Sequence, residues 1–183
     1  MRNTQKIRKL FPVLLAGLAS AALITLFLPD TVVNREAREK ALRVRCFENL
    51  KKLSAVCQAY ADRSGGQFPE DILQEESVPE RLHKQGFLPD PSITVCPSTH
   101  LHFPKHSCCF IPGVRKGMSP KMPCVIEKIT NHDRMIGVIY VDGTCEQLTH
   151  QCQSYSELLD LFSGITSGEK EILRTHFSRL DIP

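Results

Sequence analysis

The sequence predicts an α+β fold, in which a long amphipathic helix packs along one face of a small antiparallel β-sheet. Three observations support this prediction. A stretch without Gly or Pro, from Val33 to Arg63, carries apolar residues at helical spacing. A β-hairpin pattern occurs much later in the chain, and short helical patterns come after it. A helix laid against one face of such a sheet is an α+β arrangement.

A basic segment precedes an apolar one at the start of the sequence. Leu10–Leu28 contains nineteen residues without a charge. As a helix it would span roughly 28 Å, close to the roughly 30 Å of a bilayer core. The basic residues before it favour a cytoplasmic N-terminus; they are Arg2, Lys6, Arg8 and Lys9. We therefore predict a cytoplasmic segment over residues 1–9, a transmembrane helix over 10–28, and a single-pass protein of the inner membrane.

Two other interpretations of the apolar segment are less favoured. Ala19-Ser20-Ala21 has the small-x-small form of a signal peptidase site. Cleavage there would leave an apolar run at the new N-terminus, which favours an uncleaved anchor over a secreted domain. A buried core helix would show a polar face, and this segment has none.

Residues 29–63 are predicted to continue the helix as an amphipathic segment. One stripe collects the apolar positions at steps of three and four, namely Leu42, Cys46, Leu50, Leu53, Cys57 and Tyr60. The opposite face carries Arg38, Arg45, Glu48, Lys52 and Arg63, and Ser64-Gly65-Gly66 ends the helix. Cys46 and Cys57 would lie about 16 Å apart, too far for a mutual disulfide. Each is therefore expected to be a core residue or to bond a later cysteine.

Residues 64–183 are predicted to form one globular domain outside the cytoplasm. Ser77 and Glu80 form a capping-box pattern, with Gly86 at the expected C-terminal cap. Strands are expected over Ile93–Cys96, Cys108–Ile111, Val125–Ile129, Ile136–Val141 and Thr144–Leu148, the last two joined by a two-residue turn at Asp142-Gly143. Helices are expected over Tyr155–Phe162, capped by Ser154, and over Glu169–Leu180.

Three stretches of the chain carry a family resemblance. The first runs from Leu26 to Pro69 and includes NREAREKALRVRCFENLKKL and YADRSGGQFP. The second is VCPS, Val95–Ser98, and the third is NHDRMIGVIYVDGTCEQL, where nine residues separate His132 from Asp142-Gly143. In this order they resemble bacterial type IV pilin-like proteins, and among them the pseudopilin-like proteins with an H-x9-DG motif.

The resemblance implies a pilin-like fold and a non-enzymatic structural or assembly role. It implies a relation to type II secretion or type IV pilus systems, with the lipid bilayer and other pilin-like subunits or secretion components as partners. His132, Asp142 and Gly143 would then be structural motif residues.

The chain departs from the family at the processing site. Ile7 stands where a prepilin has the Gly before its cleavage point, and Pro12 stands where it has a Glu. The sequence therefore does not resemble a substrate of prepilin peptidase, and the residue that registers neighbouring subunits in a pilus is missing. Thr144 replaces the family's His after Asp-Gly.

His132 and Asp142 also invite a catalytic interpretation. The six residues of Ile136–Val141 would cover roughly 20 Å as a strand. The two side chains would then lie at opposite ends of it, so structural roles are favoured. The sequence has no G-x-S-x-G nucleophile motif and no phosphate-binding Gly-rich loop. We predict no enzymatic activity, no cofactor and no small-molecule substrate.

The segment CPSTHLHFPKHSCC raises an alternative function, a membrane-tethered metal-binding or redox module. It holds Cys96, His100, His102, His106, Cys108 and Cys109. Thiolate and imidazole are ligands that zinc and copper prefer, but the spacing matches no established zinc pattern. Adjacent strand residues point to opposite faces, so Cys108 and Cys109 suit separate disulfides or buried thiols. The segment therefore fits either metal binding or disulfides and buried thiols, and no residue is assigned as a metal ligand.

Composition narrows the functional classes. A formal net charge of +3 over 183 residues is too small to indicate nucleic-acid binding, and Phe47 is the one aromatic among the charges between Arg35 and Lys52. Eight cysteines are many for a chain kept reduced, so their number points to an oxidising compartment or to metal.

Overall fold

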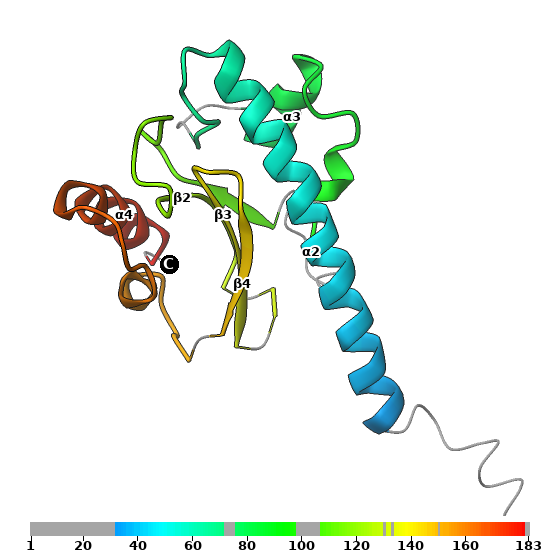
Figure 1. Ribbon diagram of the computed structural model, residues 1–183. Coiled ribbons are helices and arrows are strands. Elements are labelled where there is room, and N and C mark those ends of the chain that lie inside the picture. The colour runs from blue at the N-terminus through cyan, green and yellow to red at the C-terminus, as the bar shows by residue number, and fades with distance from the viewer. Residues whose placement is uncertain are drawn as a thin grey trace, which may run out of the picture. The chain divides into compact units, whose positions relative to one another are not determined.

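The computed structural model describes residues 32–71, 76–97, 107–129, 131–132, 134–149 and 151–181 (Figure 1). The predicted segments 1–9 and 10–28 lie outside these residues. Within the described part of the chain, no helix combines the length and apolar character needed to cross a membrane. The chain divides into two compact units, residues 1–40 and 41–183, and all of the described β-strands belong to the second.

Helix α2, Val32–Arg63, confirms a helix over residues 32–63 of the predicted segment 29–63, and residues 29–31 lie outside the described part of the chain. The positions that face the core recur at helical spacing; they are Cys46, Leu50, Leu53, Ser54, Cys57 and Ala61. The charged residues expected on the other face are exposed. The helix ends where Gly65 and Gly66 adopt φ of 64° and 88°, values that a residue with a side chain rarely takes.

Four antiparallel strands form one sheet in the order β1-β2-β3-β4. They are β1 Cys108–Phe110, β2 Pro123–Glu127, β3 Met135–Tyr140 and β4 Cys145–Thr149. Each strand pairs with the next along the chain, as short connections favour. The predicted strands are confirmed within two residues at their ends, with the exception of Ile93–Cys96. The α+β class is therefore confirmed.

The hairpin between β3 and β4 has a three-residue loop rather than the predicted two-residue turn. Tyr140 exchanges backbone hydrogen bonds with Gly143 and Thr144, each at 2.9 Å. Gly143 has φ of 86°, so the loop is a turn followed by a left-handed residue. Asp142 Oδ1 accepts hydrogen bonds from the Thr144 backbone N–H and hydroxyl, which holds the loop closed.

Along the chain, short helices come before and after the four strands. Helix α3, Val78–Lys84, begins with the predicted capping box of Ser77 and Glu80. Pro91–Thr94 forms the 3₁₀ helix η1, so the strand predicted over Ile93–Cys96 is wrong. The cause is local: the Asp90 carboxylate accepts hydrogen bonds from Ser92, and this cap begins a helical turn.

In the C-terminal part of the domain, one helix is capped by a different residue from the one predicted. The segment predicted as a helix over Tyr155–Phe162 is the 3₁₀ helix η3, Ser156–Leu161. Asp181, which comes after the last helix, accepts hydrogen bonds from the backbone N–H groups of Tyr155 and Ser156. A distant side chain thus serves in place of the predicted Ser154. Helix α4, Ser167–Leu180, is confirmed.

Helices cover both faces of the sheet: α2 from residue 41 onward lies on one side, and α4 with η3 lies on the other (Figure 1). On the first side, Ser54 Oγ and Gln58 Nε2 donate to backbone carbonyls of the β3–β4 loop at 2.8 and 2.9 Å. On the second, the rings of Phe162 and Phe177 lie 6.2 Å apart within the core. The strands β2 and β3 are consequently buried almost throughout.

Candidate functional site

Two cysteines and a histidine from three separate segments converge beneath helix α2. The potential ligand atoms of Cys46, Cys96 and His132 all lie within 4.8 Å of one another. All three residues are at least 95% buried. Cys96 Sγ and His132 Nε2 are 3.3 Å apart. Among the described residues, this is the one group of three or more metal-ligating side chains that meets such a distance limit.

A buried carboxylate adjoins the group. Glu127, at the end of β2, is 2% exposed. Its Oε1 accepts a hydrogen bond from Cys46 Sγ at 2.5 Å, and its Oε2 accepts one from the Gly137 backbone N–H at 2.8 Å. The backbone therefore fixes one carboxylate oxygen and leaves the other directed at the thiols.

Ser107 holds the Cys96 segment in place. Its hydroxyl accepts a hydrogen bond from the Cys96 backbone N–H at 2.8 Å, and its own N–H donates to the Thr94 carbonyl at 2.7 Å. The side-chain amide of Asn131 donates to the Ser107 carbonyl at 2.8 Å. Because Asn131 precedes His132, one buried serine positions both the loop with Cys96 and the turn with His132.

The other two members are placed by regular structure. Cys46 lies on the apolar stripe of α2, one helical turn before Leu50, so the helix that covers the sheet also delivers this thiol. His132 pairs with Met135 in an isolated bridge just before β3. Arg134, within that turn, has φ of 56°, a left-handed conformation that tightens the turn.

The surroundings of the group favour the protonated forms of the Cys46 thiol and the Glu127 carboxyl group. The hydrogen bond with Cys96, burial and the nearby Glu127 carboxylate raise the pKa of the Cys46 thiol far above its usual range. Burial likewise raises the pKa of Glu127, although the Cys46 thiol and His132 oppose this. Burial alone would lower the pKa of His132, but contact with Cys96 and Glu127 raises it. Charged forms of these acids are therefore costly unless a cation is close.

Of the other described residues that the sequence singled out, Cys108 lies opposite Glu127 in the pairing of β1 with β2, whereas Cys109, Asp142 and Gly143 do not join the group. His100, His102 and His106 lie outside the described residues. Cys108 and Cys109 are buried on β1, and Cys109 Sγ lies 4.0 Å from the Tyr155 hydroxyl rather than among the metal-ligating side chains. Asp142 and Gly143 form the hairpin loop after β3, whereas His132 precedes that strand.

No disulfide joins any two of the eight cysteines, all of which lie in the described part of the chain. Cys46 is buried and lies close to Cys96 from the later part of the chain, but the structure contains no bond between them, so the expected bond to a later cysteine is not formed there. Cys57 is fully buried near Cys124 and Cys145, and burial with these neighbours raises the pKa of its thiol. Cys57 thus agrees with the other expectation, that of a small core residue.

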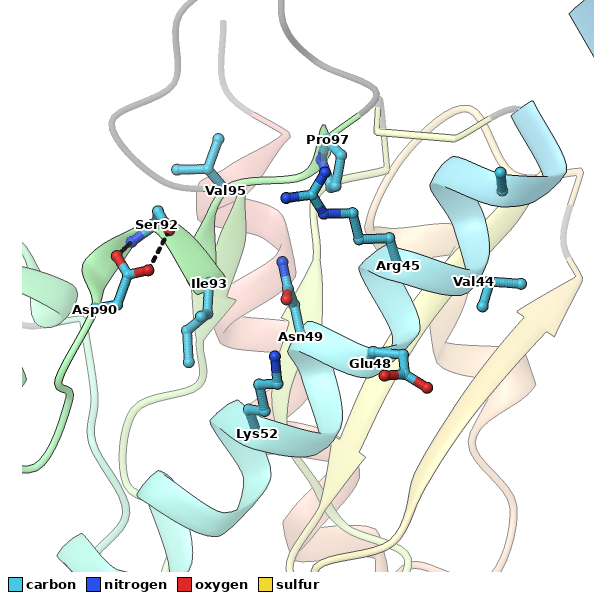
Figure 2. A pocket seen from close by; sticks show the side chains of 11 residues that line it. Val44, Arg45, Glu48, Asn49, Lys52, Asp90, Ser92, Ile93, Val95 and Pro97 are labelled. Carbon is cyan, nitrogen blue, oxygen red and sulfur yellow. Dashed lines mark hydrogen bonds between the residues drawn. The ribbon is translucent and has the colours of Figure 1, made fainter. Parts of the chain in front are cut away.

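An open groove lies on the exposed side of α2. It has a volume of about 550 Å³ and separates the helix from η1 and the residues after it. Figure 2 shows Arg45, Asn49 and Lys52 of α2 reaching toward this segment. Asp90, on the opposite wall, uses its carboxylate to cap η1. Val95 and Pro97 line the groove on either side of Cys96, whose own side chain is buried.

Sequence reasoning singled out each thiol and the histidine, but in three unrelated contexts, and it missed Glu127. The sequence did contain one indication of Glu127, namely a charged residue at the end of an apolar strand. A charged residue at such a position is either exposed or paired. No protein-family model, curated protein or solved structure matches the chain.

Proposed function

We propose that the chain is a non-enzymatic, membrane-anchored structural or assembly protein of pseudopilin-like type. The proposal includes a pilin-like fold and a relation to type II secretion or type IV pilus systems. The observation that carries it is the packing of α2 from residue 41 onward: its apolar stripe lies on a four-stranded antiparallel sheet while its charged face is exposed. That arrangement is the one the family resemblance implies.

The order of segments adds support. An uncharged apolar stretch, Leu10–Leu28, precedes this helix in the sequence and is long enough to cross a bilayer. A domain carried on such a helix would stand at the membrane surface, with its globular part available to neighbouring subunits. Filament assembly is not part of the proposal, because Pro12 replaces the Glu that registers pilin subunits.

Membrane fractionation of a bacterium expressing the full chain with a C-terminal epitope tests the proposal. The protein should remain in membranes after alkaline carbonate washing, and external protease should remove the epitope from spheroplasts. Leu18→Arg should release much of the protein, because a basic residue at the centre of an apolar span costs about 2.5–3.5 kcal/mol. The matched control is Val44→Arg at an exposed position of α2, which should stay in membranes.

A full chain that fractionates as soluble would overturn the proposal, as would an epitope protected in spheroplasts and cleaved only after lysis. The intact mass of the extracted protein provides a second test. It should correspond to the uncleaved chain without N-terminal methylation, since the residues that prepilin processing requires are absent.

A further inference from the structure

We propose that Cys46, Cys96, His132 and Glu127 form a structural zinc site that joins helix α2 to the sheet. The donor set consists of two thiol sulfurs, one imidazole nitrogen and one carboxylate oxygen. These are the ligand types that Zn²⁺ takes in proteins, and four of them make a closed tetrahedral site of the structural kind.

The distances among Cys46, Cys96 and His132 fit a tetrahedron with modest movement. Glu127 contacts Cys46 but lies outside the 4.8 Å group, so its carboxylate would move toward Cys96 and His132 to complete the site. Zinc–sulfur bonds of about 2.3 Å and zinc–nitrogen bonds of about 2.0–2.1 Å place neighbouring donor atoms roughly 3.5 Å apart. Cys96 Sγ and His132 Nε2 are 3.3 Å apart. Cys46 Sγ and Glu127 Oε1, at 2.5 Å, would separate by about 1 Å as the shared proton is replaced by the ion.

The surroundings are organised as a ligand shell. Glu127 Oε2 is held by the Gly137 N–H, which leaves Oε1 directed at Cys46 Sγ. Ser107 fixes the segments that carry Cys96 and His132. Partners of this kind orient the ligands of metal sites and contribute to their affinity.

A disulfide between Cys46 and Cys96 is the competing chemistry. It would link the two sulfurs but leave the imidazole and the carboxylate buried without their thiol partners. Burying such groups without compensation is costly, whereas a dication uses all four donors. The charge is also nearly balanced, because two thiolates, one carboxylate and Zn²⁺ sum to −1.

Zinc content of the full chain, purified in detergent with reductant and without chelator, tests the site. We expect about one zinc per chain and an X-ray absorption spectrum with two sulfur neighbours. Cys46→Ser, Cys96→Ser and His132→Gln should each lose the metal. Glu127→Gln should weaken zinc binding by at least about tenfold in a chelator competition. Matched controls are Cys109→Ser and His176→Gln, which change a buried thiol and a buried imidazole outside the site and should retain zinc.

A measurement on the wild-type chain tests the site even if the variants fail to fold. Saturating Zn²⁺ should slow alkylation of Cys46 and Cys96 by at least tenfold, as read by peptide mass mapping, and should leave the partly exposed Cys152 unaffected. Three results would overturn the proposal: reduced, folded protein that binds no added zinc; folded ligand variants that retain zinc; or native protein with a Cys46–Cys96 disulfide. The outcome is independent of membrane anchoring, so this proposal and the proposed function fail separately.

Discussion

At the scale of single residues, Gly137 on β3 marks a close approach of helix α2 to the sheet. A Cβ built there would lie 2.1 Å from Leu50 Cδ1 and 2.5 Å from Glu127 Oε2. Leu50 and Glu127 are themselves buried and have little room to move. A single methyl group would therefore displace both the helix and the carboxylate.

We predict that Gly137→Ala lowers the free energy of unfolding by about 1–3 kcal/mol or more, the usual cost of overpacking a core. Urea titration followed by far-ultraviolet circular dichroism measures this. The control is Gly168→Ala in the first turn of α4, where a Cβ meets nothing within 4 Å. The control should be neutral or slightly stabilising, because Ala favours helix over Gly by up to about 1 kcal/mol. Equal stability of wild type and Gly137→Ala would contradict this close packing.

At the scale of elements, Glu169 joins α4 to the loop before β2. Its carboxylate accepts hydrogen bonds from the Thr166 backbone N–H at 2.7 Å and from the Ser119 N–H and hydroxyl, both at 2.6 Å. Burial would raise the pKa of Glu169, but these hydrogen bonds prevail and lower it to about 2. The ionised form is thus favoured by folding.

We predict that Glu169→Gln destabilises the protein by about 1–2 kcal/mol at neutral pH, because the amide group cannot accept from all of these donors. The folded-state pKa lies below the unfolded value, so this stabilisation is present above about pH 4.5 and is lost as the pH falls toward 2. The difference between wild type and variant should shrink over that range in urea titrations. Glu171→Gln, at an exposed position of α4, should change stability by less than about 0.5 kcal/mol at any pH.

Elements whose cause is local were predictable from the sequence. The stripe of α2 results from residue spacing, and the hairpin results from Asp142-Gly143 between two β-rich runs. The prediction failed where one side chain outweighed the pattern. Asp90 begins a helical turn at Pro91, and the apolar Ile93 that suggested a strand lies within that turn. Asp181 caps η3 from 25 residues away, a contact that no local window contains.

The same contrast between local and long-range causes applies to the candidate site. Cys46, Cys96 and His132 were each notable alone: one for its helical stripe, one for its Cys/His segment and one for its spacing to Asp-Gly. Their meeting depends on how α2 lies across the sheet, which local spacing does not determine. Glu127 gave only the signal of a charged residue at the end of an apolar strand, because its role arises from the Gly137 N–H on the neighbouring strand.

At the scale of the whole molecule, burial sorts the cysteines into two classes. Six are buried, and Cys145 and Cys152 are partly exposed. In reduced, zinc-free protein, we predict that these two react first with iodoacetamide. The other six should react only when the domain unfolds, so Gly137→Ala should accelerate them about tenfold for each 1.4 kcal/mol of stability lost. Peptide mass mapping over time reads all eight positions, and early labelling of Cys124 or Cys57 would contradict the prediction.

The partners of α2 also have a consequence for biosynthesis. Several contacts that cover its apolar stripe come from much later in the chain, such as Glu127 with Cys46, 81 positions later, and Gly143 with Ser54, 89 positions later. At roughly 5–20 residues per second, a ribosome needs on the order of 4–18 s to make the intervening chain. For that time Leu50 and Leu53 lack the strand residues that cover them in the folded domain.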